Sequence, residues 1–154
     1  MPRWLGLDVG EKTIGIAISD ELGKMAFPGT TLIRAEGWRK DMAALRELIA
    51  AKEISAIVIG LPLMMDGTHG IQAEKARDFA TKLRGSVRIP IVFQDERLST
   101  READRLLMQA NRNRVERKRV VDSVAACLIL QAYLDHKDEQ EDTERLDAQL
   151  PITD

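Results

Sequence analysis

Two apolar, β-branched runs separated by a short polar turn open the chain, and this pattern constrains the fold most. The runs are Trp4–Val9 and Ile14–Ser19, and the turn between them is Gly10–Thr13. Apolar runs joined by polar turn residues predict a β-hairpin. One strand of this hairpin carries Asp8, and a carboxylate is costly to bury unless it is paired or bound to a cation. The fold is therefore expected to begin with an antiparallel pair that holds an acid.

Beyond the hairpin, the apolar pattern alternates between strand spacing and helix spacing. Strands are predicted at Phe27–Ile33, Ser55–Gly60 and Ile89–Asp95. Helices are predicted at Trp38–Lys52, Ile71–Arg84, Ser99–Ala110 and Arg119–Asp135. The run at residues 55–60 is continuously apolar, as central parallel strands are. A hairpin followed by this alternation predicts an α/β fold in three layers, with a mixed sheet flanked by helices.

Length and charge indicate one domain followed by an acidic tail. The chain has 154 residues, of which 44% are hydrophobic, which is enough for one buried core. From Asp135 to Asp154 there are eight acids and two bases. We therefore expect a domain over residues 1–135 and a disordered, solubilising tail over residues 136–154.

Cysteine and hydropathy patterns predict a cytoplasmic protein. The single cysteine, Cys127, has no internal disulfide partner, and His69 and His136 lack the spacing of a zinc site. No apolar run approaches the roughly 20 residues that cross a bilayer, and no secretory signal opens the chain. We expect no membrane partner.

Three acids lie in apolar surroundings. Asp8 interrupts the first strand, Glu96 follows a predicted parallel strand, and Asp122 begins the most apolar helix. Ligand sites of open α/β sheets gather at the carboxyl ends of parallel strands. A shared divalent cation would satisfy all three carboxylates, because oxygen ligands suit Mg²⁺ and Mn²⁺. Ion pairs with Arg97 or Lys12, turn formation and a helix-dipole contact are alternatives that the residues alone leave open.

Four separated motifs, in order, resemble the YqgF family of bacterial RNase H-like proteins. They are "LGLDVGEKTIGIAISD", "IVIGLPLMMDGT", "DERLSTREA" and "VVDSVAACLILQAYL", and the resemblance covers about residues 4–135. The family is described both as Holliday-junction resolvases and as nucleases that mature the small-subunit ribosomal RNA precursor. The resemblance implies an RNase H-like, five-stranded mixed sheet whose first three strands are antiparallel. It also implies that Asp8, Glu96 and Asp122 are the catalytic, metal-binding acids.

The expected function is that of a metal-dependent nuclease acting on structured nucleic acid, with the 5′ end of pre-16S rRNA as its substrate in ribosome biogenesis. Two Mg²⁺ or Mn²⁺ ions are expected. The one obvious fourth acid, Asp95, is adjacent to Glu96 on a strand and should face the other way, so coordination should depend on substrate phosphate and be weak without it. Alternatives are a Holliday junction resolvase acting on branched DNA and a non-catalytic RNA-binding ribosome-assembly factor. A small nucleotide-binding module ranks last. Ribosomal particles are expected partners, and the protein is expected to be a monomer or a weak homodimer.

Cationic and polar side chains around the motifs are candidate nucleic-acid contacts. The segment "RNRVERKR" holds five bases and one acid, which suits a polyanion but equally suits a solvated loop. Asp66 and Thr68 follow a parallel strand and either contact substrate or form a turn and helix cap. The predicted contacts are Lys12, Thr13, Arg97, Arg112, Arg114, Arg117, Lys118 and Arg119.

Overall fold

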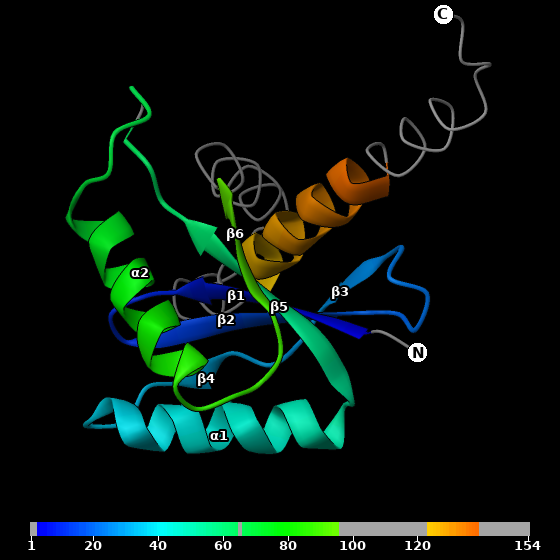
Figure 1. Cartoon of the computed structure of the whole chain (residues 1–154), viewed down its shortest axis with the longest axis horizontal. Coiled ribbons are helices and arrows are strands. Elements are labelled where there is room, and N and C mark those ends of the chain that lie inside the picture. Colours follow the sequence, from blue (N-terminus) through cyan, green and yellow to red (C-terminus); the bar gives the residue numbers. More distant parts are fainter. Residues whose placement is uncertain (1–2, 65, 96–122, 139–154) are drawn as a thin grey trace, which may run out of the picture.

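The computed structural model describes residues 3–64, 66–95 and 123–138 (Figure 1). Residues 123–138 form a helix that follows the labelled elements in the chain. In chain order, these labelled elements are β1 (Arg3–Val9), β2 (Thr13–Ser19), β3 (Ala26–Pro28), β4 (Leu32–Ile33), α1 (Trp38–Ala51), β5 (Ile54–Leu61), α2 (Ile71–Arg84) and β6 (Ile91–Asp95).

The strands form one mixed sheet in the order β3-β2-β1-β5-β6, and β4 also pairs with β2. The pairs β1–β2, β2–β3 and β2–β4 are antiparallel. The pairs β1–β5 and β5–β6 are parallel. β1 therefore lies where the antiparallel hairpin meets the parallel part of the sheet, which places Asp8 next to the carboxyl end of β5 and one strand away from that of β6.

Helices cover both faces of the sheet, as the three-layer prediction requires (Figure 1). On one face, Leu5 and Leu7 of β1 pack in a cluster with Met42 of α1 and Phe79 of α2. On the other face, Ala17 and Val58 pack against the helix 123–138. Successive strand residues point to opposite faces, so β1 contributes its leucines to one core and its even-numbered residues to the other.

The antiparallel start of the sheet and its α/β class are confirmed, but the predicted third strand is split. Phe27–Ile33 forms β3 and β4, so the described sheet has six strands rather than five. The break occurs where Gly29 N–H donates to the Ile16 carbonyl (2.7 Å) and the Gly29 carbonyl accepts from the Ser123 hydroxyl (2.9 Å). The Gly29 N–H thus still bonds to β2, whereas the Gly29 carbonyl is taken up by the last helix instead of a neighbouring strand.

The remaining boundaries agree closely with the sequence prediction where the structure describes them. The α2 bounds match, and α1 ends one residue before the predicted Lys52. The last helix continues to residue 138, three residues into the predicted tail. The predicted helix Ser99–Ala110 and residues 139–154 lie outside the described residues. Among the helices described, none combines the length and the apolar character that a bilayer crossing requires.

Candidate active site

Asp8 lies near the carboxyl end of β1, on the sheet face covered by the helix 123–138. It pairs in register with Gly15 of β2, and its predecessor Leu7 pairs with Ile59 of β5. Because Leu7 packs into the α1–α2 core, alternation turns Asp8 to the opposite face. Its side chain is half-buried. The structure thus holds this carboxylate on a rigid central strand, at the edge of the sheet where ligand sites collect.

Glu96 lies outside the described residues, but its neighbour Asp95 is the last residue of β6. Asp95 pairs with Leu61, and Gln94 pairs with Gly60. Phe93 packs in the same core as Leu7, whereas Val92 packs on the side of the helix 123–138. Alternation therefore turns Asp95 away from the face of Asp8, so the two carboxylates do not share one side of the sheet.

Asp122 also lies outside the described residues, but Ser123 beside it is firmly docked. Ser123 is buried, its hydroxyl donates to the Gly29 carbonyl at 2.9 Å, and it lies 3.0 Å from the Thr31 hydroxyl. Gly29 is bonded in turn to Ile16 of β2, the neighbour of Gly15 in the strand. The described start of this helix is thus anchored to the strand that pairs with Asp8.

Gly6 explains why the helix 123–138 can approach β1 so closely. A Cβ atom at this position would lie 2.7 Å from Leu130 Cβ and 3.0 Å from the Ala126 carbonyl oxygen. Leu130 and Ala126 are both fully buried. A glycine two residues before Asp8 therefore sets the distance between the helix and the strand that carries the acid.

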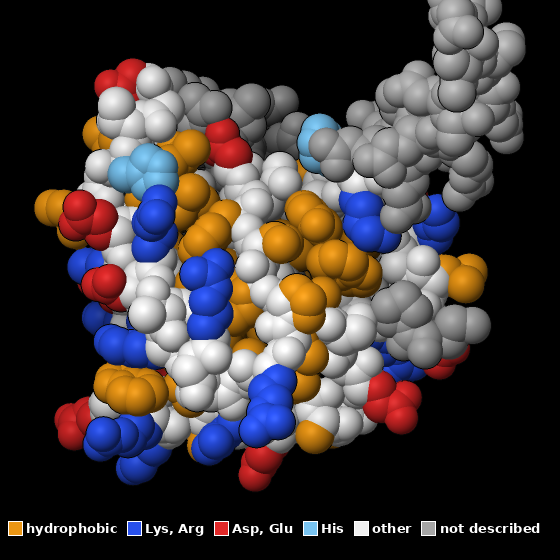
Figure 2. Space-filling model, in the orientation of Figure 1, with side chains coloured by type: hydrophobic (Ala, Val, Ile, Leu, Met, Phe, Trp, Pro, Cys, Tyr) orange, Lys and Arg blue, Asp and Glu red, His pale blue; other side chains and the backbone are white. Residues whose placement is uncertain are grey.

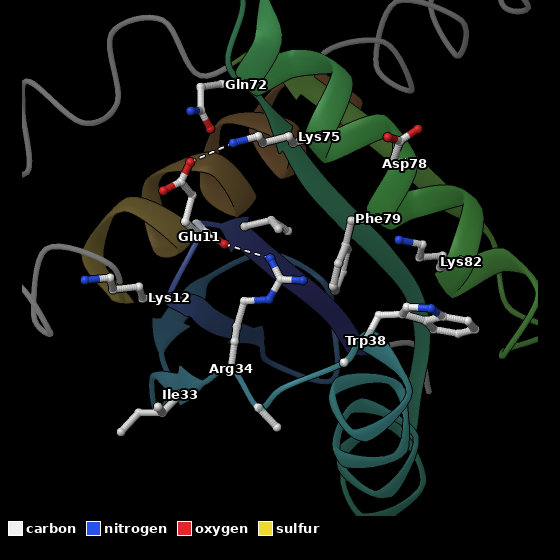
Figure 3. Close-up of a pocket in the computed structure, with 14 residues that line it drawn as sticks. Glu11, Lys12, Ile33, Arg34, Trp38, Gln72, Lys75, Asp78, Phe79 and Lys82 are labelled. Carbon is white, nitrogen blue, oxygen red and sulfur yellow. Dashed lines mark hydrogen bonds and ion pairs between the residues drawn. The ribbon is translucent and has the colours of Figure 1, made fainter.

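The residues Lys12 and Thr13 line different pockets, and the Lys12 side chain extends away from the other residues of its pocket (Figure 3). Lys12 lines a pocket of about 650 Å³ on the α1–α2 side of the sheet. Thr13 lines a second pocket of about 520 Å³, together with Ser123, Thr31 and Gly29. Gly15 pairs with Asp8, and Thr13 lies two residues from Gly15 on β2, so Thr13 is on the same face of the sheet as Asp8. Lys12 does not line this second pocket.

Asp66 and Thr68 form a closed turn. Asp66 Oδ1 accepts hydrogen bonds from the Thr68 N–H (2.9 Å) and the Thr68 hydroxyl (2.7 Å). Gly67 between them has a φ of 87°, and the Met64 N–H donates to the Thr68 carbonyl. The predicted turn is present, but the predicted helix cap is wrong, because Gly70 is the N-cap residue of α2 and no side chain caps this helix. Contact of these exposed side chains with substrate stays a prediction.

The other predicted contacts, Arg97, Arg112, Arg114, Arg117, Lys118 and Arg119, lie outside the described residues. Two of the three predicted metal ligands do so as well. Within residues 3–64, 66–95 and 123–138, no three His, Cys, Asp or Glu side chains converge to hold a metal. The described part of the site therefore consists of Asp8, Thr13 and the docked start of the last helix.

A second group of polar residues was missed by the sequence reasoning. Glu11 Oε1 and Lys75 Nζ form an ion pair at 2.6 Å, and Arg34 Nη1 donates to the Gly10 carbonyl at 2.9 Å (Figure 3). The Lys75 ammonium lowers the pKa of the Glu11 carboxyl below its usual value. The spacing of Lys75, Phe79 and Lys82 on one stripe of α2 is the signal that could have pointed to this group.

The arrangement of a mixed sheet between helices, with an acid on the central strand, defines an RNase H-like α/β protein. A crystal structure of Thermus thermophilus RuvC in complex with a Holliday junction substrate has the same fold, with a TM-score of 0.53. The match covers 89% of this chain and 96% of RuvC at 12% sequence identity, and the structure titled "Thermus thermophilus RuvC structure" gives a TM-score of 0.50.

Relatives in other bacteria are much more similar in sequence. A Moorella thermoacetica protein named "Putative pre-16S rRNA nuclease" is 49% identical over 133 residues, which are 86% of this chain and 94% of the relative. A Syntrophomonas wolfei protein of the same name is 46% identical over 133 residues, with the same coverage of both chains. The family model described as "RuvX: Holliday junction resolvase" matches residues 2–136. The chain belongs to the RuvX family, which confirms the resemblance seen in its motifs, and its class is that of a nuclease, a hydrolase of phosphodiester bonds.

Proposed function

We propose that this chain is a divalent-metal-dependent nuclease that processes the 5′ end of pre-16S rRNA in ribosome biogenesis. The observation that carries the proposal is the half-buried Asp8 at the carboxyl end of β1, on the face where Ser123 anchors the last helix. The names of the Moorella thermoacetica and Syntrophomonas wolfei relatives support pre-16S rRNA as the substrate.

The proposed ligand set is Asp8, Glu96 and Asp122. Glu96 directly follows the last residue of β6, and Asp122 directly precedes Ser123, so the chain connects both to the edge that holds Asp8. Consecutive Cα atoms are 3.8 Å apart. This connection supports a common site for the three carboxylates.

Asp8, the one proposed ligand among the described residues, suits a hard divalent cation. A carboxylate that is half-buried and rigidly held is a suitable ligand for Mg²⁺ or Mn²⁺, of which we propose two ions. When bound, such ions lower the pKa of water and stabilise charge on a phosphodiester. The protein's own part is to hold Asp8 in place through the β1–β2 and β1–β5 pairings, and to fix the helix 123–138 beside β1 through the close packing at Gly6.

Cationic and hydroxyl side chains would hold the phosphate backbone near this edge. Lys12 and Thr13 lie at the β1–β2 turn. The proposed contacts outside the described residues are Arg97, Arg112, Arg114, Arg117, Lys118 and Arg119. Neutralisation of phosphates by Lys and Arg dominates nucleic-acid affinity. Ribosomal particles are the proposed setting, with the chain acting as a monomer or a weak homodimer in the cytoplasm.

A Holliday junction resolvase is the second candidate, and the description of the matching family model favours it. A resolvase that cuts two symmetric strands requires two sites related by a twofold axis. The discriminating experiment therefore compares cleavage of a pre-16S rRNA 5′ fragment with cleavage of a four-way DNA junction by the same preparation.

The test of the proposed function is the Asp8→Asn variant. Mutation of residues that only hydrogen-bond to metal ligands typically lowers metal affinity or activity 10- to 100-fold. Loss of a direct ligand is therefore expected to reduce rRNA cleavage at least about 100-fold. Asp135→Asn makes the same chemical change at an exposed position near the far end of the last helix, and its cleavage rate should equal wild type. Full cleavage by Asp8→Asn would contradict the role of Asp8 as a metal ligand. Function of this variant in cells that depend on the gene, together with no rRNA cleavage by the wild-type chain, would instead support the non-catalytic assembly factor. Cleavage of the junction without cleavage of rRNA would favour the resolvase.

A further inference from the structure

A pocket of about 650 Å³ lies on the α1–α2 side of the sheet, behind the β1–β2 turn (Figure 3). Its walls are the turn itself, the segment 33–38 that leads into α1, and one stripe of α2. Val9 lines this pocket, while Asp8 beside it faces the opposite side of the sheet. The pocket is therefore separate from the proposed metal site but opens at the same edge of the sheet.

Cationic side chains outnumber acidic side chains in the pocket lining. Lys12, Arg34, Lys75 and Lys82 line it, against two acids, Glu11 and Asp78. Figure 2 shows Lys and Arg side chains over α1 and α2, interspersed with Asp and Glu side chains. A pocket of this size suits a ligand with several functional groups, and its excess of cations selects an anion.

Arg34 is held rigidly at the back of the pocket. Its Nε donates to Asp41 Oδ2 at 3.0 Å, and its Nη1 donates to the Gly10 carbonyl at 2.9 Å. Its guanidinium lies 5.4 Å above the centre of the Phe79 ring. Nη2 takes part in neither hydrogen bond. The charge is thus pre-organised before any ligand arrives, which lowers the entropic cost of binding.

Trp38 stands at the mouth of the pocket with 37% of its surface exposed. Lys82 Nζ lies 5.6 Å from the centre of its ring, and Arg39 Cζ lies 5.3 Å from it. Lys82 and Arg39 are exposed, so these flexible side chains can leave the ring faces. An exposed indole beside mobile cations provides a stacking surface for a nucleobase with charge at hand for its phosphate.

We propose that this pocket binds one unpaired nucleotide of the substrate strand, with its base on Trp38 and its phosphate on Lys82 and Lys75. The inference rests on the proposed nuclease function and names how that function holds its substrate. A strand held here would pass over the β1–β2 turn toward the face of Asp8. The combination of an indole, pre-organised Arg34 and mobile lysines favours a nucleotide over an inorganic anion, because an inorganic anion would make no use of the indole.

Glu11 would compete with this phosphate for Lys75. Its carboxylate holds Lys75 at 2.6 Å, and both side chains are more than half exposed. An incoming phosphate must take Lys75 from Glu11. Glu11→Gln therefore releases Lys75 and should tighten binding, whereas Lys75→Gln should weaken it.

The test measures binding of a 5′-labelled, single-stranded RNA hexamer to the full chain by fluorescence anisotropy, in EDTA so that no cleavage occurs. Stacking contributes about 1–3 kcal/mol per base, so Trp38→Leu is expected to raise the Kd about 5- to 150-fold. Trp38→Phe should restore most of the affinity, because phenylalanine retains a stacking face. Lys82→Gln should weaken binding, whereas Lys40→Gln, an exposed α1 lysine away from the pocket, should not.

The outcomes separate this inference from the proposed function. Asp8→Asn should bind the hexamer as wild type does and yet fail to cleave, whereas Trp38→Leu should raise the KM for cleavage and leave kcat nearly unchanged. Hexamer binding by a folded Trp38→Leu variant at wild-type affinity would overturn the inference. AMP bound as tightly as the hexamer, with no effect of Trp38→Leu on the KM, would also overturn it and indicate a site for free nucleotides.

Discussion

Gly6 shows how a single missing side chain shapes the neighbourhood of the proposed site. The helix 123–138 packs so closely on β1 that an alanine Cβ would meet Leu130 Cβ at 2.7 Å. Both partners are backbone or buried side-chain atoms, so neither can swing away into solvent. The close approach is possible only because glycine has no Cβ.

Gly6→Ala is therefore expected to lower the free energy of unfolding by about 1–3 kcal/mol, the usual cost of overpacking a core. Urea unfolding followed by circular dichroism measures the change. Gly85→Ala is the matched control, because Gly85 is exposed at the end of α2, has a φ of −74° and leaves a Cβ at an ordinary 3.5 Å from its nearest contact. The control should be neutral or slightly stabilising. Equal effects of the two substitutions would contradict this account of the helix–strand contact.

At the scale of elements, α1 begins without a side-chain cap. Its N-cap residue is Gly37, with a φ of 85°, and it makes no side-chain cap hydrogen bond. Asp41 in the first turn ties the helix to the segment that precedes it: it accepts the Ala35 N–H at 3.1 Å and pairs with Arg34 at 3.0 Å. Asp41 is 2% exposed and Arg34 is 25% exposed, so this pair is largely shielded from solvent. One acid thus fixes the start of a helix and orients the guanidinium of the cationic pocket.

Asp41→Ala is expected to cost about 2–3 kcal/mol, below the 3–5 kcal/mol of a fully buried pair because water still reaches Arg34. Thermal and urea unfolding measure this loss. Glu47→Ala removes an exposed acid from the same helix and should change stability by less than about 0.5 kcal/mol. A variant at position 41 as stable as wild type would show that Arg34 is held by Gly10 alone.

At the scale of the whole molecule, charge is distributed unevenly along the chain. Residues 1–134 carry 21 bases and 17 acids, whereas residues 139–154 carry six acids and one base. We propose that the segment 139–154 is the acidic, solubilising tail expected from its composition. Such a segment would repel a polyanion from the basic body of the protein.

Deletion of residues 139–154 is therefore expected to leave the unfolding temperature within about 1–2 °C of wild type and to tighten RNA binding at low salt. The difference in affinity should shrink as salt rises, since ions screen exposed charges. Anisotropy titrations from low to high salt test this. A chain of full length with its six tail acids changed to their amides separates charge from length, and it should match the deletion. A large loss of thermal stability on deletion would mean that the tail packs on the domain.

Local periodicity accounts for the parts of the fold that could be predicted. The α2 bounds were predicted without error because Ala76, Phe79, Ala80 and Leu83 repeat at helical spacing and are buried on one face. The segment Phe27–Ile33 is predicted as one strand because the pattern of apolar residues along it carries no information about contacts with residues far away in the chain. The Gly29 carbonyl that interrupts it is bonded to Ser123, 94 residues further along the chain.

The sequence by itself determined the α/β class, the family, the candidate acids and most of the described elements, because hydrophobic period and motif order are read directly from the chain. Only the tertiary structure decided which face each side chain occupies and which distant residues meet. Sheet register places Asp8 on the face of the helix 123–138 and Thr13 in the pocket on that face, whereas strand alternation alone predicts that Asp95 faces away from Glu96. The Glu11–Lys75 pair joins residues 64 positions apart, a proximity that arises from packing α2 over the sheet rather than from any local pattern.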